Sequence, residues 1–181
     1  EQILLRAPQG FPAGEHVVAL TFRGILNDQL VGFYRSTFTS TDAESGAEVE
    51  HTLAVTQFES THARRAFPCF DEPALKAVFS IDLVVPDHLL AVSNSAEVAR
   101  EELGDGLVRV RFADTMIMST YLVAFVIGPL EVTATRMVAG SNGPIPLRIV
   151  HPPGTAALTD FALDVAEHGL RFFEQYYGLP Y

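Results

Sequence analysis

The sequence contains one cysteine, no tryptophan and no long apolar run. Because Cys69 has no partner cysteine, the chain does not require an oxidising compartment, and we expect a cytoplasmic protein. We also expect a bacterial origin. Arg, Asp or Glu interrupts every apolar stretch before it reaches the roughly 18 residues of a membrane helix. No basic-then-apolar leader opens the chain. We therefore expect no membrane span in this chain, and an anchor upstream stays open.

Basic residues are also few, with 12 Lys and Arg against 22 Asp and Glu and a formal net charge of -10. A surface of this sign repels the phosphate backbone, so we expect no nucleic-acid partner.

The sequence lacks the common motifs of catalytic centres. No two of its six histidines stand four residues apart, as the zinc helix HExxH requires. Glycine-rich phosphate loops and the GxSxG nucleophile motif are absent as well. The six histidines are His16, His51, His62, His88, His151 and His168. We expect neither a bound metal nor a complete catalytic centre in this chain.

Hydrophobic residues make up 48% of the sequence, which predicts a packed globular chain. Short segments rich in β-branched and aromatic residues predict strands, and Asn, Asp and Gly between them favour tight turns. The predicted strands are 16–23, 32–39, 48–57, 79–85, 89–93, 107–112, 121–127, 131–137 and 147–150. The sequence therefore predicts an all-β fold of mainly antiparallel sheets.

One helix is predicted near the end of the sequence, where apolar residues recur with a period of 3.6. Pro152, Pro153 and Gly154 break the chain before it, and Gly178 stops it. Its apolar side consists of Leu158, Phe161, Ala162, Val165, Gly169, Phe172 and Tyr176. We divide the chain into a β domain over 1–153 and, over 154–181, the helix and the start of a linker.

Polar and apolar residues alternate where the segment 48–57 ends. If Phe58 points into the core, Gln57 and Glu59 emerge together on the opposite face and could bind a ligand. Alternatively, both are ordinary solvent-facing residues, with Glu59 near Arg64 or Arg65.

The loop that follows carries two further candidates. Asp71 and Glu72 could act as acid and base, but adjacent side chains rarely face one substrate, and pairing with Arg64 or Arg65 is the simpler interpretation. Cys69 could be a nucleophile near His62, or a small buried hydrophobic residue.

Four segments together resemble one protein family. The string TQFESTHARRAFPCFDEPALKAVF (56–79) resembles a signature of the N-terminal domain of M1 zinc aminopeptidases. Three further strings resemble elements of that family in the same order: FRGILNDQLVGFYRSTF (22–38), MSTYLVAFVIG (118–128) and LRFFEQYYGLPY (170–181).

The resemblance implies a saddle-like or sandwich domain that helps an aminopeptidase bind the free amino end of peptides. It implies that Glu59, with Gln57 beside it, lines the substrate site, and that zinc binds in a following catalytic domain with GxMEN and HExxH motifs. This piece would then be inactive alone, and its exposed sheet edges could self-associate. Two alternatives stay open: a non-catalytic M1-like scaffold for protein interaction, and a free-standing sugar- or peptide-binding β-sandwich, although sugar sites favour Trp.

Overall fold

Strands account for most of the regular structure in the computed structural model, which describes residues 3–41 and 45–181. The strands are β1 (Gly32–Thr41), β2 (Glu48–Gln57), β3 (Asp82–Pro86), β4 (Leu90–Ser93), β5 (Glu97–Gly104), β6 (Leu107–Phe112), β7 (Phe125–Gly128), β8 (Glu131–Val132), β9 (Arg136–Gly140), β10 (Gly143–Leu147) and β11 (Val150–His151). The helices are the short 3-10 turns η1 (Ala63–Arg65), η2 (Thr120–Leu122) and η3 (Ala156–Leu158), and the α-helix α1 (Thr159–Tyr177).

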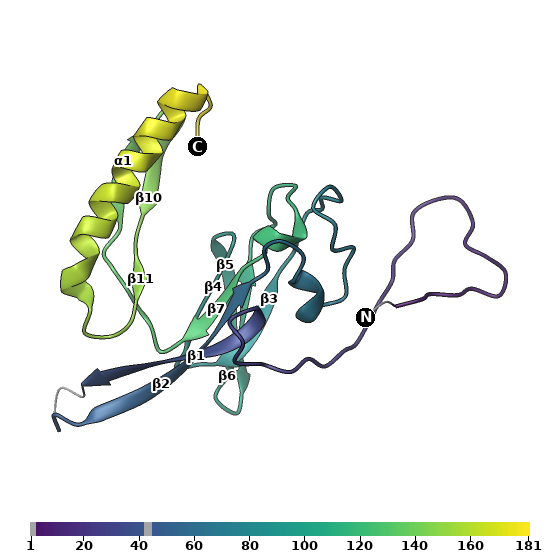
Figure 1. Ribbon diagram of the computed structural model, residues 1–181, viewed down its shortest axis with the longest axis horizontal. Coiled ribbons are helices and arrows are strands. Elements are labelled where there is room, and N and C mark those ends of the chain that lie inside the picture. Colours follow the sequence, from purple (N-terminus) through teal and green to yellow (C-terminus); the bar gives the residue numbers. More distant parts are fainter. Residues whose placement is uncertain (1–2, 42–44) are drawn as a thin grey trace.

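Two antiparallel sheets form the body of the molecule (Figure 1). The four-stranded sheet has the order β1-β2-β7-β4, and the three-stranded sheet has the order β3-β6-β5. β1 and β2 pair along their whole length, from Gly32 opposite Gln57 to Thr41 opposite Glu48. The predicted fold class, mainly antiparallel sheets with one C-terminal helix, is confirmed. Whether the edge strands pair with another copy of the chain stays a prediction.

The hydrophobic core takes its side chains from both sheets. Val108, Val110 and Phe112 of β6 are buried, and the residues between them, Arg109 and Arg111, form ion pairs at the surface. β6 therefore has one apolar and one polar face, as its alternating sequence predicts. The buried members of the core are Phe58, Ala63, Ile81, Val85, Ala91, Val108, Val110, Phe112, Met118 and Val123.

One predicted strand is absent and one observed strand was not predicted, for the same reason. Residues 16–23 have strand-forming side chains, yet they pair with no strand among the described residues and lie in an extended N-terminal stretch beside the body (Figure 1). Conversely, β5 was not predicted, because all eight of its residues are exposed and no apolar alternation marks it. Hydrogen bonds to a neighbouring strand define a strand, and side-chain propensity reports them only indirectly.

The remaining strands form a hairpin that supports the helix. β9 pairs with β10, β8 pairs with β11 at its base, and α1 packs against β9 and β10. Arg136 of β9 forms ion pairs with Asp164 and Glu167 of α1. The predicted helix is confirmed and ends at Gly178, whose left-handed backbone suits glycine. No helix in the described part of the chain has the length and apolar character needed to cross a membrane.

Candidate functional site

Gln57 and Glu59 lie where β2 ends and the loop toward η1 begins. Both side chains are exposed, and the backbone N–H of Glu59 donates a hydrogen bond to Gln57 Oε1 at 3.2 Å. The peptide bond between Glu59 and Ser60 is cis. The two polar side chains are thus neighbours at one end of the sheet, as the sequence pattern predicted.

Phe58 fixes this end of the strand to the core. Its side chain is 1% exposed and makes edge-to-face contacts with Phe67 and Phe125, with ring centroids 5.9 and 6.4 Å apart. Its carbonyl accepts a hydrogen bond from the backbone N–H of His62 at 2.8 Å. Such aromatic pairs contribute about 0.5–1.5 kcal/mol each beyond the burial of their area. The backbone between Gln57 and Glu59 is therefore held firmly.

The loop after Glu59 is held by a buried carboxylate, Asp71. Asp71 Oδ2 accepts hydrogen bonds from the backbone N–H of Arg64 at 3.0 Å and from Arg64 Nε at 2.9 Å, and Oδ1 accepts one from Thr120 Oγ1 at 2.7 Å. Burial alone would raise the pKa of Asp71, but the hydrogen bonds from Arg64 and Thr120 outweigh it and hold the pKa below its usual value. The predicted pairing of this loop is confirmed, with Asp71 and Arg64 as the partners.

This pairing leaves Glu59 free. The interpretation that Glu59 lies near Arg64 or Arg65 does not hold as an ion pair, because Arg64 binds Asp71 and none of the described residues forms a hydrogen bond or an ion pair with the Glu59 carboxylate. The exposure of Glu59 agrees both with a ligand-binding residue and with an ordinary solvent-facing one. An exposed, uncompensated carboxylate on a rigid support can accept a cationic ligand.

Cys69 is unsuited to act as a nucleophile. Its side chain packs against the hydrophobic core, and burial, with a smaller contribution from the charge of Asp71, raises the pKa of its thiol to about 11. The thiolate is the reactive form, so this thiol is almost entirely unreactive near neutral pH. The interpretation of Cys69 as a small hydrophobic residue is the better one.

Two residues that hold the loop were not recognised in the sequence. The hydroxyl of Thr120 binds Asp71, and the Ser119 hydroxyl donates to the carbonyl of Pro73 at 2.6 Å. Both are buried. The available signal was a pair of adjacent hydroxyls at the start of an apolar run, where buried polar groups need partners.

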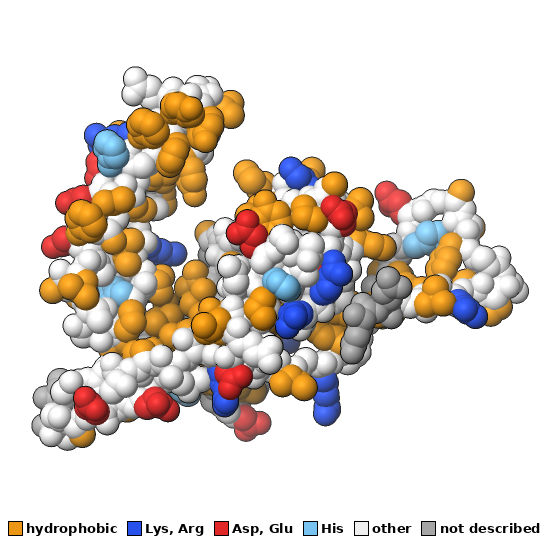
Figure 2. Space-filling model, in the orientation of Figure 1, with side chains coloured by type: hydrophobic (Ala, Val, Ile, Leu, Met, Phe, Trp, Pro, Cys, Tyr) orange, Lys and Arg blue, Asp and Glu red, His pale blue; other side chains and the backbone are white. Residues whose placement is uncertain are grey.

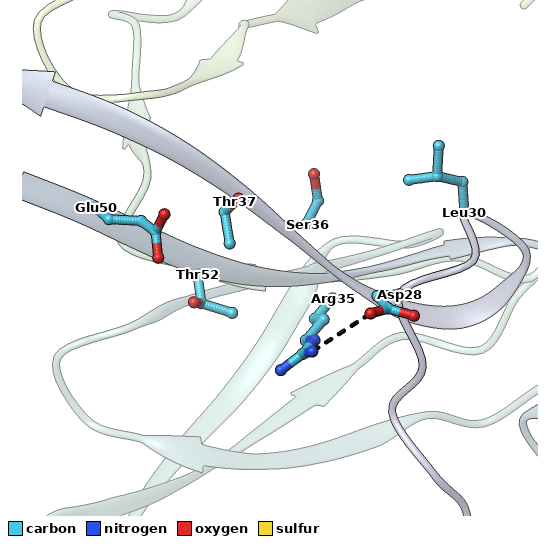
Figure 3. A pocket seen from close by; sticks show the side chains of 7 residues that line it. All are labelled: Asp28, Leu30, Arg35, Ser36, Thr37, Glu50 and Thr52. Carbon is cyan, nitrogen blue, oxygen red and sulfur yellow. Dashed lines mark hydrogen bonds and ion pairs between the residues drawn. The ribbon is translucent and has the colours of Figure 1, made fainter.

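A hollow on the β1–β2 hairpin lies away from this site. Its polar lining includes Arg35 and Asp28, which form an ion pair at 3.4 Å, and Glu50 of β2 (Figure 3). Glu50 and Gln57 are seven positions apart on one strand, which corresponds to about 23 Å at 3.3 Å per residue. Neither Gln57 nor Glu59 is among the residues that line this hollow.

Comparison with known proteins identifies the family. The family described as "Peptidase M1 N-terminal domain" matches residues 1–122 of this chain. Aminopeptidase M1-A of Oryza sativa subsp. japonica is 40% identical over 100% of this chain and 19% of the relative. The alanine/arginine aminopeptidase of Saccharomyces cerevisiae is 44% identical over 90% of this chain and 18% of the relative. Endoplasmic reticulum aminopeptidase 1 of Rattus norvegicus is 38% identical over 100% of this chain and 19% of the relative.

The chain belongs to the M1 aminopeptidase family. It spans about a fifth of the length of these curated relatives, which is consistent with a fragment of an aminopeptidase. The prediction of a cytoplasmic, bacterial protein is wrong, because the relatives are eukaryotic enzymes, one named for the endoplasmic reticulum, and they establish no cytoplasmic location.

Zinc is implied by the family, but the residues at hand do not fit a zinc site. Across residues 3–41 and 45–181, no group of three or more His, Cys, Asp or Glu side chains is placed to hold a metal ion. Catalytic zinc needs three protein ligands around an open position.

Proposed function

We propose that this chain is the substrate-binding N-terminal part of an M1 zinc aminopeptidase that removes amino acids from peptides with a free amino end. Glu59 binds the protonated amino group, and Gln57 lies beside it. The observation that carries this assignment is the exposed, partnerless carboxylate of Glu59, considered among the described residues, at the end of an anchored strand.

The support of Glu59 suits a binding role better than a role in folding. Two acidic side chains that stabilise this molecule have cationic partners, Asp71 in Arg64 and Asp82 in Arg111. Glu59 instead follows the buried Phe58 and precedes the loop that Asp71 holds. A binding group that is already in position loses little conformational entropy when its ligand arrives.

The electrostatics of this pairing explain selectivity for a free amino end. At about 4 Å and an effective dielectric constant near 20, a carboxylate attracts a cation by roughly 4 kcal/mol before desolvation costs. An acetylated peptide has no such charge and would leave Glu59 desolvated without a partner. Rejection of a substrate that leaves a polar group unpaired is a strong form of discrimination.

Glu59→Ala in the full-length enzyme tests the proposal. We expect kcat/KM for free-amine substrates to fall by more than tenfold, which corresponds to about 1.4 kcal/mol or more of transition-state stabilisation. Glu50→Ala removes an exposed carboxylate from β2, the strand that precedes Glu59, and should leave kcat/KM within twofold of the wild type. Equal kinetics for the Glu59 variant and the wild type would exclude Glu59 from substrate binding.

A further inference from the structure

Among the described residues, Asp71 is the only Asp, Glu, Lys or Arg that is buried. Figure 2 shows acidic and basic side chains standing at the surface of the body and of the helix. Burying a carboxylate costs free energy unless hydrogen bonds compensate for the lost water. The one charged side chain that this part of the chain buries thus lies in the loop that follows Glu59, and its partners define what it holds.

The two carboxylate oxygens of Asp71 have different partners. Oδ2 accepts hydrogen bonds from the backbone N–H and from Nε of Arg64, and Arg64 Nη2 donates to the backbone carbonyl of Asp71 at 2.6 Å. Oδ1 accepts one from Thr120 Oγ1 at 2.7 Å, its only hydrogen bond from the described residues. The hydroxyl of Thr120, a residue that is 3% exposed, therefore satisfies an oxygen that solvent barely reaches.

The path from Asp71 back to Glu59 is short. Asp71 binds the backbone of Arg64 in η1, and the N–H of His62, just before η1, donates to the carbonyl of Phe58 at 2.8 Å. Only two residues separate Glu59 from His62. Because each residue has just two soft backbone dihedral angles, this segment has little freedom to absorb a shift of η1. The position of Glu59 therefore depends on the position of Asp71.

The stretch that contains Thr120 also holds the chain on the other side of Glu59. η2 leads into β7, and the backbone N–H of Phe125, the first residue of β7, donates to Thr56 Oγ1 at 3.0 Å. Thr56 lies three residues before Glu59. Residues 120–125 thus contact the chain both before Glu59, at Thr56, and after it, at Asp71.

We propose that Thr120 is a positioning residue for substrate binding, which acts through Asp71, Arg64 and η1 to hold the carboxylate of Glu59 where the amino end of the peptide binds. This assignment rests on the role proposed for Glu59. Without the hydroxyl, Oδ1 of Asp71 is buried with no donor, and the carboxylate moves toward another donor at the expense of its hydrogen bonds to Arg64. Small displacements of a binding group weaken binding strongly, so the supporting hydrogen bonds contribute to function.

Thr120→Val in the full-length enzyme removes the hydroxyl and keeps the shape of the side chain. Leucine hydroxamate and 4-methylpentanohydroxamic acid, two competitive inhibitors, differ only in the α-amino group. The Ki of the compound without the amine, divided by the Ki of the compound with it, measures recognition of the amino end alone. We expect Thr120→Val to lower this ratio by roughly fivefold or more, and Thr120→Ser, which keeps the hydroxyl, to restore it to within about twofold of the wild type.

Thr115→Val is the matched control. Thr115 is also buried and accepts a hydrogen bond from the backbone N–H of Phe79 at 3.0 Å, but it does not bind Asp71. It should lower the Tm and leave the Ki ratio within about twofold of the wild type. If Thr120→Val and Thr115→Val change the ratio equally, or if a folded Thr120→Val enzyme keeps the wild-type ratio, Thr120 has no positioning role.

Glu59→Ala separates the two proposals, because it should bring the same ratio close to one. A wild-type ratio in Glu59→Ala would overturn the role of Glu59 together with that of Thr120. A low ratio in Glu59→Ala beside a wild-type ratio in Thr120→Val would overturn the role of Thr120 alone.

A second measurement needs no substitution. Since coupling between two sites is reciprocal, leucine hydroxamate should slow hydrogen exchange at the Arg64 amide of the wild-type enzyme more than 4-methylpentanohydroxamic acid does, with both at saturation. Equal exchange in the two complexes would contradict the coupling between Glu59 and Asp71.

Discussion

Asp71→Asn is the sharpest test of how the loop after Glu59 is held in place. The Asp71 carboxylate accepts three hydrogen bonds, two from Arg64 and one from Thr120, and only 2% of its side chain is exposed. An Asn side chain has one acceptor oxygen in place of two. If that oxygen serves Thr120, the amide NH₂ group faces the donors of Arg64, and two hydrogen bonds are lost.

The magnitude follows from the kind of bond that is lost. Hydrogen bonds to a charged group contribute about 1.5–3 kcal/mol each, but the Arg64 side chain is 50% exposed, so water can replace part of its interaction. We expect Asp71→Asn to lower the free energy of unfolding by about 3 kcal/mol at pH 7. For a chain of this size that corresponds to a Tm lower by roughly 6–12 °C.

The effect should depend on pH in a defined direction. The pKa of Asp71 is lowered in the folded protein. The contribution of its carboxylate to the free energy of unfolding is therefore complete above the unfolded pKa of about 3.9 and is lost as the pH falls through the folded pKa. Urea unfolding of wild type and variant should therefore differ most at pH 5–7 and converge as the pH drops below about 4. Asp82→Asn, at an exposed ion pair with Arg111, is the control and should change the Tm little.

Two results would refute this reasoning. The first is a Tm of the Asp71 variant equal to that of the wild type, which would mean that solvent satisfies the same groups at no cost. The second is a difference between wild type and variant that is constant from pH 7 to pH 3, which would show that the loss does not come from the ionised carboxylate.

Three further predictions concern the packing around the site. Gly128→Ala should destabilise the chain by about 1–3 kcal/mol in urea unfolding, since an added Cβ would lie 2.7 Å from Cβ of Leu53. Gly24→Ala, with no atom within 4 Å of the added Cβ, should have little effect. Cys69 should react with iodoacetamide at pH 8 at least tenfold more slowly than a free thiol, because its pKa is about 11; a comparable rate would disprove its burial. Phe58→Ala should cost about 3–5 kcal/mol, and a loss below about 1 kcal/mol would show that Phe58 does not anchor β2.

Strands with one apolar face were predictable from the residues alone. β6 was predicted with its observed bounds, because Val108, Val110 and Phe112 alternate with polar residues. β5 escaped prediction because both of its faces meet solvent, and its pairing with β6 is stabilised by backbone hydrogen bonds and by ion pairs such as that between Glu101 and Arg109. Residues 16–23 show the reverse case, in which propensity is present and a partner strand is not.

The site was predictable in part. Alternation around Phe58 placed Gln57 and Glu59 on the outer face, and the resemblance to M1 aminopeptidases singled out Glu59. Neither argument could choose between Arg64, Arg65 and solvent as the surroundings of Glu59. The structure gives Arg64 to Asp71, because the two residues meet across a loop that Thr120, 49 positions further along the chain, helps to hold.

The sequence of neighbouring residues was enough to predict most strand and helix segments, the exposed pair Gln57 and Glu59 at the end of β2, and the resemblance to the family. Side-chain periodicity and short motifs are properties of neighbouring residues. Contacts between residues distant in sequence determined that Asp71 is the carboxylate paired with Arg64, that the thiol of Cys69 is unreactive, and which face of α1 packs against the hairpin. The exposed apolar face of α1, formed by Leu158, Phe161, Val165, Phe172 and Tyr176, shows the difference most clearly. Its spacing predicted the helix, yet the opposite side of α1 packs against the hairpin, because ion pairs and hydrogen bonds from Arg136 and Ser141 orient the helix.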